Sequence, residues 1–166
     1  MLLLLAVLLH ECGHILLLIL TGGKLKGVSF SLYGITMKAE YPPSYSAKIM
    51  ISLGGPLVGI LAFLLCRNAG KTLALFSDIN LWLSLFNLLP ISFLDGGCAV
   101  ESCFLLFLPY DHATALSRAV SLITATLLWS ISVYLFLFLN GSPSLFLLSL
   151  WFFFSLLFFD NTKRAG

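Results

Sequence analysis

Long apolar runs separated by short polar segments make up most of the chain. The first run, Met1–Leu20, is interrupted only by the polar stretch His10–His14. About 20 apolar residues in a helix cross the hydrocarbon core of a bilayer. The second run covers 47–66, and the third ends in a broken segment at 87–97. The last two runs cover 113–139 and 145–159. The pattern therefore predicts a polytopic bundle of membrane helices with about five spans, of which 145–159 is short.

Between the first two runs the period changes from helical to alternating. From about residue 27 to 39, apolar and polar residues alternate, with an interruption at Tyr33-Gly34. This pattern predicts a small membrane-associated β-hairpin that turns there. A hairpin between membrane helices must bury its edges in protein or line a wet cavity. Two roles stay open for it: a plain surface hairpin, or an edge strand offered to an extended peptide.

The third apolar run ends in a segment that cannot continue as a regular helix. It begins near Leu73, or near Ile79 if Asp78 caps the helix. Pro90 removes a backbone donor, and Gly96-Gly97 loosens the chain. A broken membrane helix is tolerated only where it lines a protein-buried or wet cavity, and Asp95 is the acid placed there. The alternative is an ordinary interfacial aspartate at a helix end. Residues 98–108 lie at the interface or continue the third helix.

The composition is typical of a membrane protein and limits the kinds of partner to expect. Hydrophobic residues make up 60% of the chain and charged residues 10%, where a soluble domain carries about 25% charged residues. We therefore expect one integral membrane domain over 1–166. The net charge of +2 gives no indication of a nucleic-acid partner, and the lipid bilayer is the expected surroundings.

The motif His10-Glu11-Cys12-Gly13-His14 lies in the middle of the first apolar run. On a helix, His10 and His14 are at i and i+4, so both imidazoles project from one face. That spacing lets two nitrogens reach one zinc ion, with Glu11 beside the reacting water. The alternative is a pair of satisfied core histidines plus a stray glutamate. That alternative leaves three polar groups in hydrocarbon without a purpose, so the pattern favours a functional site.

Asp95 is the expected third ligand of this zinc site. Catalytic zinc keeps three protein ligands and one open position, and His10, His14 and Asp95 would supply three for one Zn2+ per chain. Counted from Asp78 as the outer end of the third helix, 17 residues descend roughly 25 Å, which places Asp95 at a depth similar to His10. His112 lies in a loop beside Asp111 and is expected at the surface. Glu11 would act as general base for peptide hydrolysis.

The basic residues predict the orientation in the membrane. Five spans place the 22–46 loop, the 95–112 loop and the C-terminus on one side, with most of the lysines. The other side carries only Arg67 and Lys71. The positive-inside rule then puts the hairpin and the C-terminal tail in the cytoplasm, and the active site toward the cytoplasm.

Two motifs together resemble the site-2 protease family of intramembrane zinc metalloproteases. They are His10-Glu11-Cys12-Gly13-His14 and the segment from Asn87-Leu88-Leu89-Pro90 through Leu94-Asp95-Gly96. The resemblance covers roughly residues 1–108, and it implies a catalytic three-helix core with the hairpin there and accessory C-terminal helices at 109–166. It implies that His10, His14 and Asp95 bind zinc and that Glu11 is catalytic. It also implies cleavage of a membrane-anchored protein within or near its transmembrane segment.

The compact form resembles the bacterial, sporulation-type branch of that family. This branch processes a membrane-tethered sigma-factor precursor in the cell membrane, and a regulatory membrane partner would fit the resemblance. The branch has a helix before the His-Glu motif, which suggests a truncated start here. Two positions depart from the family pattern, Ser92 for a proline and Gly59 for an asparagine, and both bear on substrate handling rather than zinc binding.

Two other functions compete with the protease hypothesis. A degenerate relative could hold a membrane partner without cutting it, although such a binder would not need Glu11. A metal transporter would need several acids or histidines along a path, whereas the polar groups here converge on one place.

Overall fold

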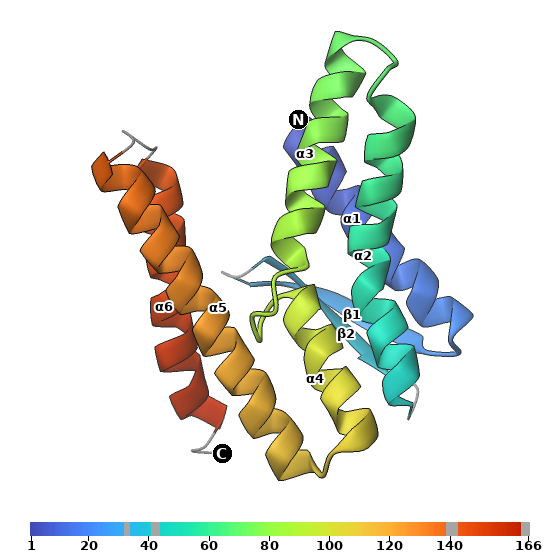
Figure 1. The fold of residues 1–166 in the computed structure, drawn as a ribbon. Helices are drawn as coiled ribbons and strands as arrows, with labels where there is room; N and C mark the ends of the chain where they lie inside the picture. Colours follow the sequence, from blue (N-terminus) through green and yellow to red (C-terminus); the bar gives the residue numbers. More distant parts are fainter. Residues whose placement is uncertain (32–33, 41–43, 139–142, 164–166) are drawn as a thin grey trace.

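The computed structural model describes residues 1–31, 34–40, 44–138 and 143–163. In chain order the elements are α1 (Leu2–Leu20), β1 (Lys24–Ser31), β2 (Gly34–Glu40), α2 (Tyr45–Cys66), α3 (Lys71–Asn87), α4 (Asp95–Phe107), α5 (Tyr110–Phe138) and α6 (Pro143–Lys163). Figure 1 shows α1 to α4 grouped around the hairpin, with the α5–α6 pair leaning away beside α4. This arrangement confirms the predicted fold class, a helical membrane bundle with a small β-hairpin.

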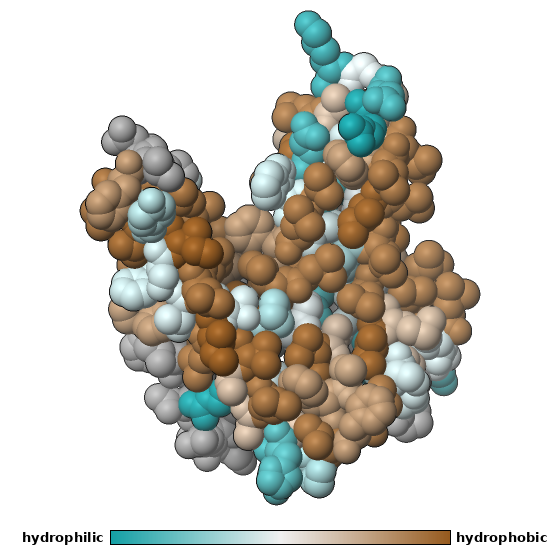
Figure 2. All heavy atoms as spheres, viewed as in Figure 1, coloured by the Kyte–Doolittle hydropathy of each residue, from teal (hydrophilic) through white to brown (hydrophobic). Residues whose placement is uncertain are grey.

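Within the described residues, three helices are long and apolar enough to cross a membrane: α1, α2 and α5. The helix α3 has 17 residues, and the apolar part of α6, Pro143–Leu156, is shorter still. All six helices expose large apolar side chains, which in water would be unfavourable but in lipid are ordinary. Figure 2 shows hydrophilic atoms concentrated at the upper and lower ends, with a hydrophobic surface between them. The chain is thus a membrane protein, and the number of five spans stays a prediction.

Glycines bring α1 and α2 into backbone contact. A Cβ atom built on Gly54 would lie 2.6 Å from the carbonyl oxygen of Gly13, and one built on Gly13 would lie 2.8 Å from the carbonyl carbon of Gly54. Neither position could carry a side chain without moving one helix. Membrane helices gain most of their association energy from such close packing, because lipid supplies no hydrophobic driving force.

The interface between α2 and α3 is polar on the α3 side. Ser77, Asn80 and Ser84 are fully buried, and each donates a side-chain hydrogen bond to a carbonyl one turn earlier in its own helix, at 2.7 to 2.8 Å. These bonds satisfy the donors without help from water. Opposite them lies Gly59, whose missing side chain makes room for Ser84.

The third helix is broken where the sequence predicted, and of its two predicted starts the one near Leu73 agrees with the structure. The helix α3 begins at Lys71 with Gly70 as N-cap, so Asp78 lies inside the helix and does not cap it. It ends at Asn87, and Asp95 begins the separate helix α4, so residues 98–108 do not continue α3. The count of residues from Asp78 was therefore wrong.

Gly96 and Gly97 act by close packing and not by loosening the chain. Both are buried in the first turn of α4. A Cβ on Gly96 would lie 2.7 Å from the carbonyl oxygen of Leu89, and one on Gly97 would lie 2.8 Å from the amide nitrogen of Ser92. The first turn of α4 therefore folds back against the backbone of the break, which fixes where Asp95 stands.

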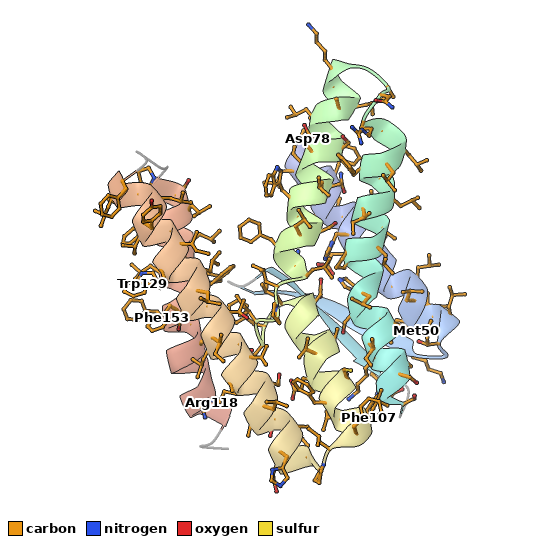
Figure 3. The ribbon with its side chains drawn as sticks, viewed as in Figure 1. Met50, Asp78, Phe107, Arg118, Trp129 and Phe153 are labelled. Carbon is orange, nitrogen blue, oxygen red and sulfur yellow. The ribbon has the colours of Figure 1, made fainter. Side chains whose placement is uncertain are left out.

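The α5–α6 pair packs on the break through a small apolar core. Ile91, Ala125, Phe152 and Leu156 are buried together, with Phe86 and Phe93 among the side chains packed against them. Between the two helices, the hydroxyls of Ser132 and Ser149 lie 2.5 Å apart, and the rings of Trp129 and Phe153 stack at 5.8 Å (Figure 3). The accessory helices are thereby joined to the segment that carries Asp95.

The hairpin follows the predicted alternation but begins three residues earlier. Strands β1 and β2 are antiparallel, with Lys24 opposite Glu40, Ser31 opposite Gly34 and an irregularity between Leu25 and Gly27. The predicted turn near Tyr33-Gly34 includes Tyr33, which lies outside the described residues. Lys26 and Glu40 form an exposed ion pair.

Candidate metal centre

Two histidines of α1 and the distant Asp95 of α4 meet where α1, α2 and α4 come together. His10 Nε2 lies 2.9 Å from Asp95 Oδ2, and His14 Nε2 lies 3.2 Å from both Asp95 Oδ2 and His10 Nε2. The two histidines are 4% and 6% exposed, whereas the Asp95 side chain keeps 24% of its surface accessible. The structure thus brings together the residues expected as ligands, although the depth count that paired them was wrong.

A carbonyl of α2 fixes the tautomer of His14. His14 Nδ1 donates a hydrogen bond of 2.7 Å to the carbonyl oxygen of Ile51. In a neutral imidazole the other nitrogen, Nε2, then carries only a lone pair. That lone pair faces the carboxylate of Asp95 and the Nε2 atom of His10. Electron-rich atoms at 3.2 Å repel each other unless a proton or a metal cation lies among them.

The donor set and its spacing fit zinc. Two imidazole nitrogens and one carboxylate are typical ligands of catalytic zinc, which leaves a fourth position open. Zinc lies about 2.0–2.2 Å from such ligands, and a tetrahedron of that size has edges of about 3.3–3.5 Å. The observed edges of 2.9 and 3.2 Å are slightly shorter than this. A small outward shift of the three side chains would suffice to admit the ion.

The two histidines differ in what their Nδ1 atoms contact. His14 is held by Ile51, as metal-binding histidines usually are. His10 Nδ1 is buried and has no hydrogen-bond partner among the described residues. The ring of His10 is instead positioned edge-on against His14, with centroids 4.9 Å apart and planes at 76°.

Glu11 lies at the edge of this group and not within it. Its carboxylate is half-buried and interacts electrostatically with His10, His14 and Asp95. No hydrogen bond within the described part of the chain ties it to another group. A carboxylate in that position can accept a proton from a water molecule that approaches the three candidate ligands.

His112, the one other histidine, is not part of the site. It is exposed, as predicted, but it lies in the first turn of α5 and not in a loop. Sequence reasoning missed two contributions from α2, the Ile51 carbonyl and the bare backbone at Gly55. Gly54 packs against the backbone of Gly13, whereas Gly55 faces the two histidines, a difference between neighbouring glycines that the sequence does not reveal.

Three known proteins resemble this chain in fold or in sequence. The site-2 protease from Methanocaldococcus jannaschii has a similar structure, with a TM-score of 0.65 and 26% identity, over 93% of this chain and 74% of that one. Stage IV sporulation protein FB of Bacillus subtilis is 35% identical over 138 residues, which are 76% of this chain and 47% of that protein. A Synechocystis sp. protein provisionally named a zinc metalloprotease is 31% identical over 109 residues, 58% of this chain and 28% of its own length.

These likenesses define a helical membrane protein of the site-2 protease class. The Peptidase M50B-like family model matches residues 1–95, a range that runs from before the first histidine to Asp95. The chain belongs to this family, in its sporulation-type branch. It spans about half the length of Stage IV sporulation protein FB and less of the Synechocystis protein.

Proposed function

We propose that this chain is an intramembrane zinc metalloendopeptidase that cleaves a membrane-anchored protein within or near its transmembrane segment. The observation that carries the proposal is the meeting of His10, His14 and Asp95, with Glu11 beside them. Family membership and the zinc metalloprotease name of one relative support it.

In this proposal His10, His14 and Asp95 hold the metal, and Ile51 keeps His14 in the tautomer that presents Nε2. A zinc ion held there would polarise both the scissile carbonyl and the attacking water. Glu11 takes the proton of that water as general base and returns it to the leaving amine. Because Glu11 is half-buried, its carboxylate stays beside the candidate ligands and is still accessible to water.

The substrate would be a membrane-tethered protein, and a sigma-factor or transcription-factor precursor fits the sporulation-type branch. We further propose a multi-pass protein of the bacterial cell membrane whose site opens toward the cytoplasm. The lysines of the hairpin segment support this orientation. The hairpin remains a candidate for holding an unwound substrate as an added strand, since each strand of a two-stranded sheet has an outer edge.

The test measures zinc content and peptide cleavage on the same detergent-purified samples. The substrate probe is a transmembrane peptide with helix-breaking residues in its middle. Wild type should contain about one zinc per chain and cleave the peptide. Glu11→Gln should keep its zinc and lose at least about a hundredfold of the rate, as expected for a general base. Asp95→Ala should lose both.

Asp78→Asn serves as the control, because it removes another membrane acid, on α3 and outside the candidate ligand group. It should match wild type in zinc content and in rate. Full zinc in Asp95→Ala would contradict the ligand set, and full activity in Glu11→Gln would contradict the base. Zinc binding without cleavage by any form would favour the binding-protein alternative.

A further inference from the structure

One wall of the candidate metal centre has no side chain. A Cβ atom built on Gly55 would lie 2.6 Å from His10 Nε2 and 2.7 Å from His10 Cδ2, and still closer to His14 Nε2. Its three nearest neighbours are therefore all imidazole atoms, and two of them are the candidate ligand nitrogens.

This crowding differs from that at the other two glycines of α2. A Cβ on Gly54 would meet the backbone of Gly13, and one on Gly59 would meet Ser84 and the backbone of Asn80. Those two glycines allow α2 to pack closely against α1 and α3. Gly55 alone among the three faces the ligand atoms, so ordinary helix packing does not explain its missing side chain.

We propose that Gly55 is a positioning residue whose bare Cα keeps open the space in front of His10 Nε2 and His14 Nε2 that the metal and its fourth ligand require. A methyl group there would occupy part of that space or push the two rings apart. Since the ligand nitrogens are only 3.2 Å apart, a displacement of less than 1 Å would spoil a tetrahedral site. The inference rests on the proposed function only as far as metal binding and does not require peptide cleavage.

The experiment compares wild type, Gly55→Ala and Gly59→Ala as full chains in detergent. Zinc affinity is measured by competition with a chelator, and Co2+ is then substituted for zinc to record its visible absorption. Gly55→Ala should bind zinc at least tenfold more weakly and give a weaker, shifted cobalt spectrum. Gly59→Ala, which crowds the same helix away from the site, should lower the thermal midpoint but keep the wild-type affinity and spectrum.

A second comparison keeps the proposal testable if Gly55→Ala folds poorly. In a His10→Ala/His14→Ala background the atoms that the methyl group would strike are gone, so adding Gly55→Ala should leave the thermal midpoint unchanged. An equal loss of stability in that background would overturn the proposal, as would wild-type zinc affinity and cobalt spectrum in Gly55→Ala itself. If wild type bound no zinc, the proposed protease function would be contradicted. That outcome differs from failure of the Gly55 proposal, in which wild type binds zinc and Gly55→Ala binds it equally well.

Discussion

At the scale of single residues, the candidate centre depends on backbone groups as much as on side chains. His14 is oriented by a carbonyl of α2, and the space before it exists because Gly55 has no side chain. The histidines and Asp95 could be predicted from the sequence, because two imidazoles at i and i+4 and an acid in a broken membrane helix are costly unless used. The Ile51 carbonyl could not, since any residue type supplies one.

The charge of Asp95 matters more to the centre than its shape. Asp95→Asn keeps the size and one oxygen of the side chain but removes the negative charge that faces two imidazoles at 2.9 and 3.2 Å. We expect zinc affinity to fall at least tenfold, because a neutral amide is a poorer ligand, while the thermal midpoint of the metal-free protein changes little. Chelator competition and thermal unfolding in detergent measure the two quantities. Unchanged affinity would remove Asp95 from the ligand set.

At the scale of elements, helices and hairpin were predictable, and their exact ends were not. Apolar runs and the alternation of residues 27–39 located α1, α2, α5 and the hairpin, because period and length are local properties. Of the two predicted starts of α3, the one near Leu73 agrees with the observed start at Lys71, whereas Asp78, although a strong capping residue type, lies inside the helix. The role of Gly96 and Gly97 depends on which backbone folds against them, and that is not a local property.

The close packing of Gly59 on α2 against Ser84 on α3 predicts that a second substitution can restore stability lost by the first. Gly59→Ala should destabilise the chain by about 1–3 kcal/mol, because the new methyl group would strike the Ser84 hydroxyl in a packed interface. Ser84→Ala removes that hydroxyl, and the Gly59→Ala/Ser84→Ala double variant should recover most of the lost stability. Unfolding free energies of the four proteins, measured under the same conditions, give the coupling energy. Additive losses would mean that Ser84 is not what the methyl group meets.

At the scale of the whole molecule, the accessory helices are mechanically connected to the candidate centre. The residues between α3 and α4 connect the two groups of helices, because Asp95 follows them as the first residue of α4 and Ile91 among them is buried with Ala125, Phe152 and Leu156. Phe152 of α6 lies edge-on to Phe93 at 5.4 Å and to Phe86 at 6.5 Å. The position of Asp95 therefore depends on packing contributed by the end of the chain that is most distant in sequence from His10.

Truncating Phe152 should accordingly weaken metal binding from a distance. Phe152→Ala would leave a cavity beside Phe93, at a cost of about 3–5 kcal/mol or less if the helices close in, and the segment that ends at Asp95 would lose its support. We expect zinc affinity to fall several-fold even at temperatures where the protein stays folded. Leu147→Ala, on the exposed face of the same helix, should leave affinity unchanged. Equal affinities in the two variants would show that the α5–α6 pair stabilises the fold without positioning Asp95.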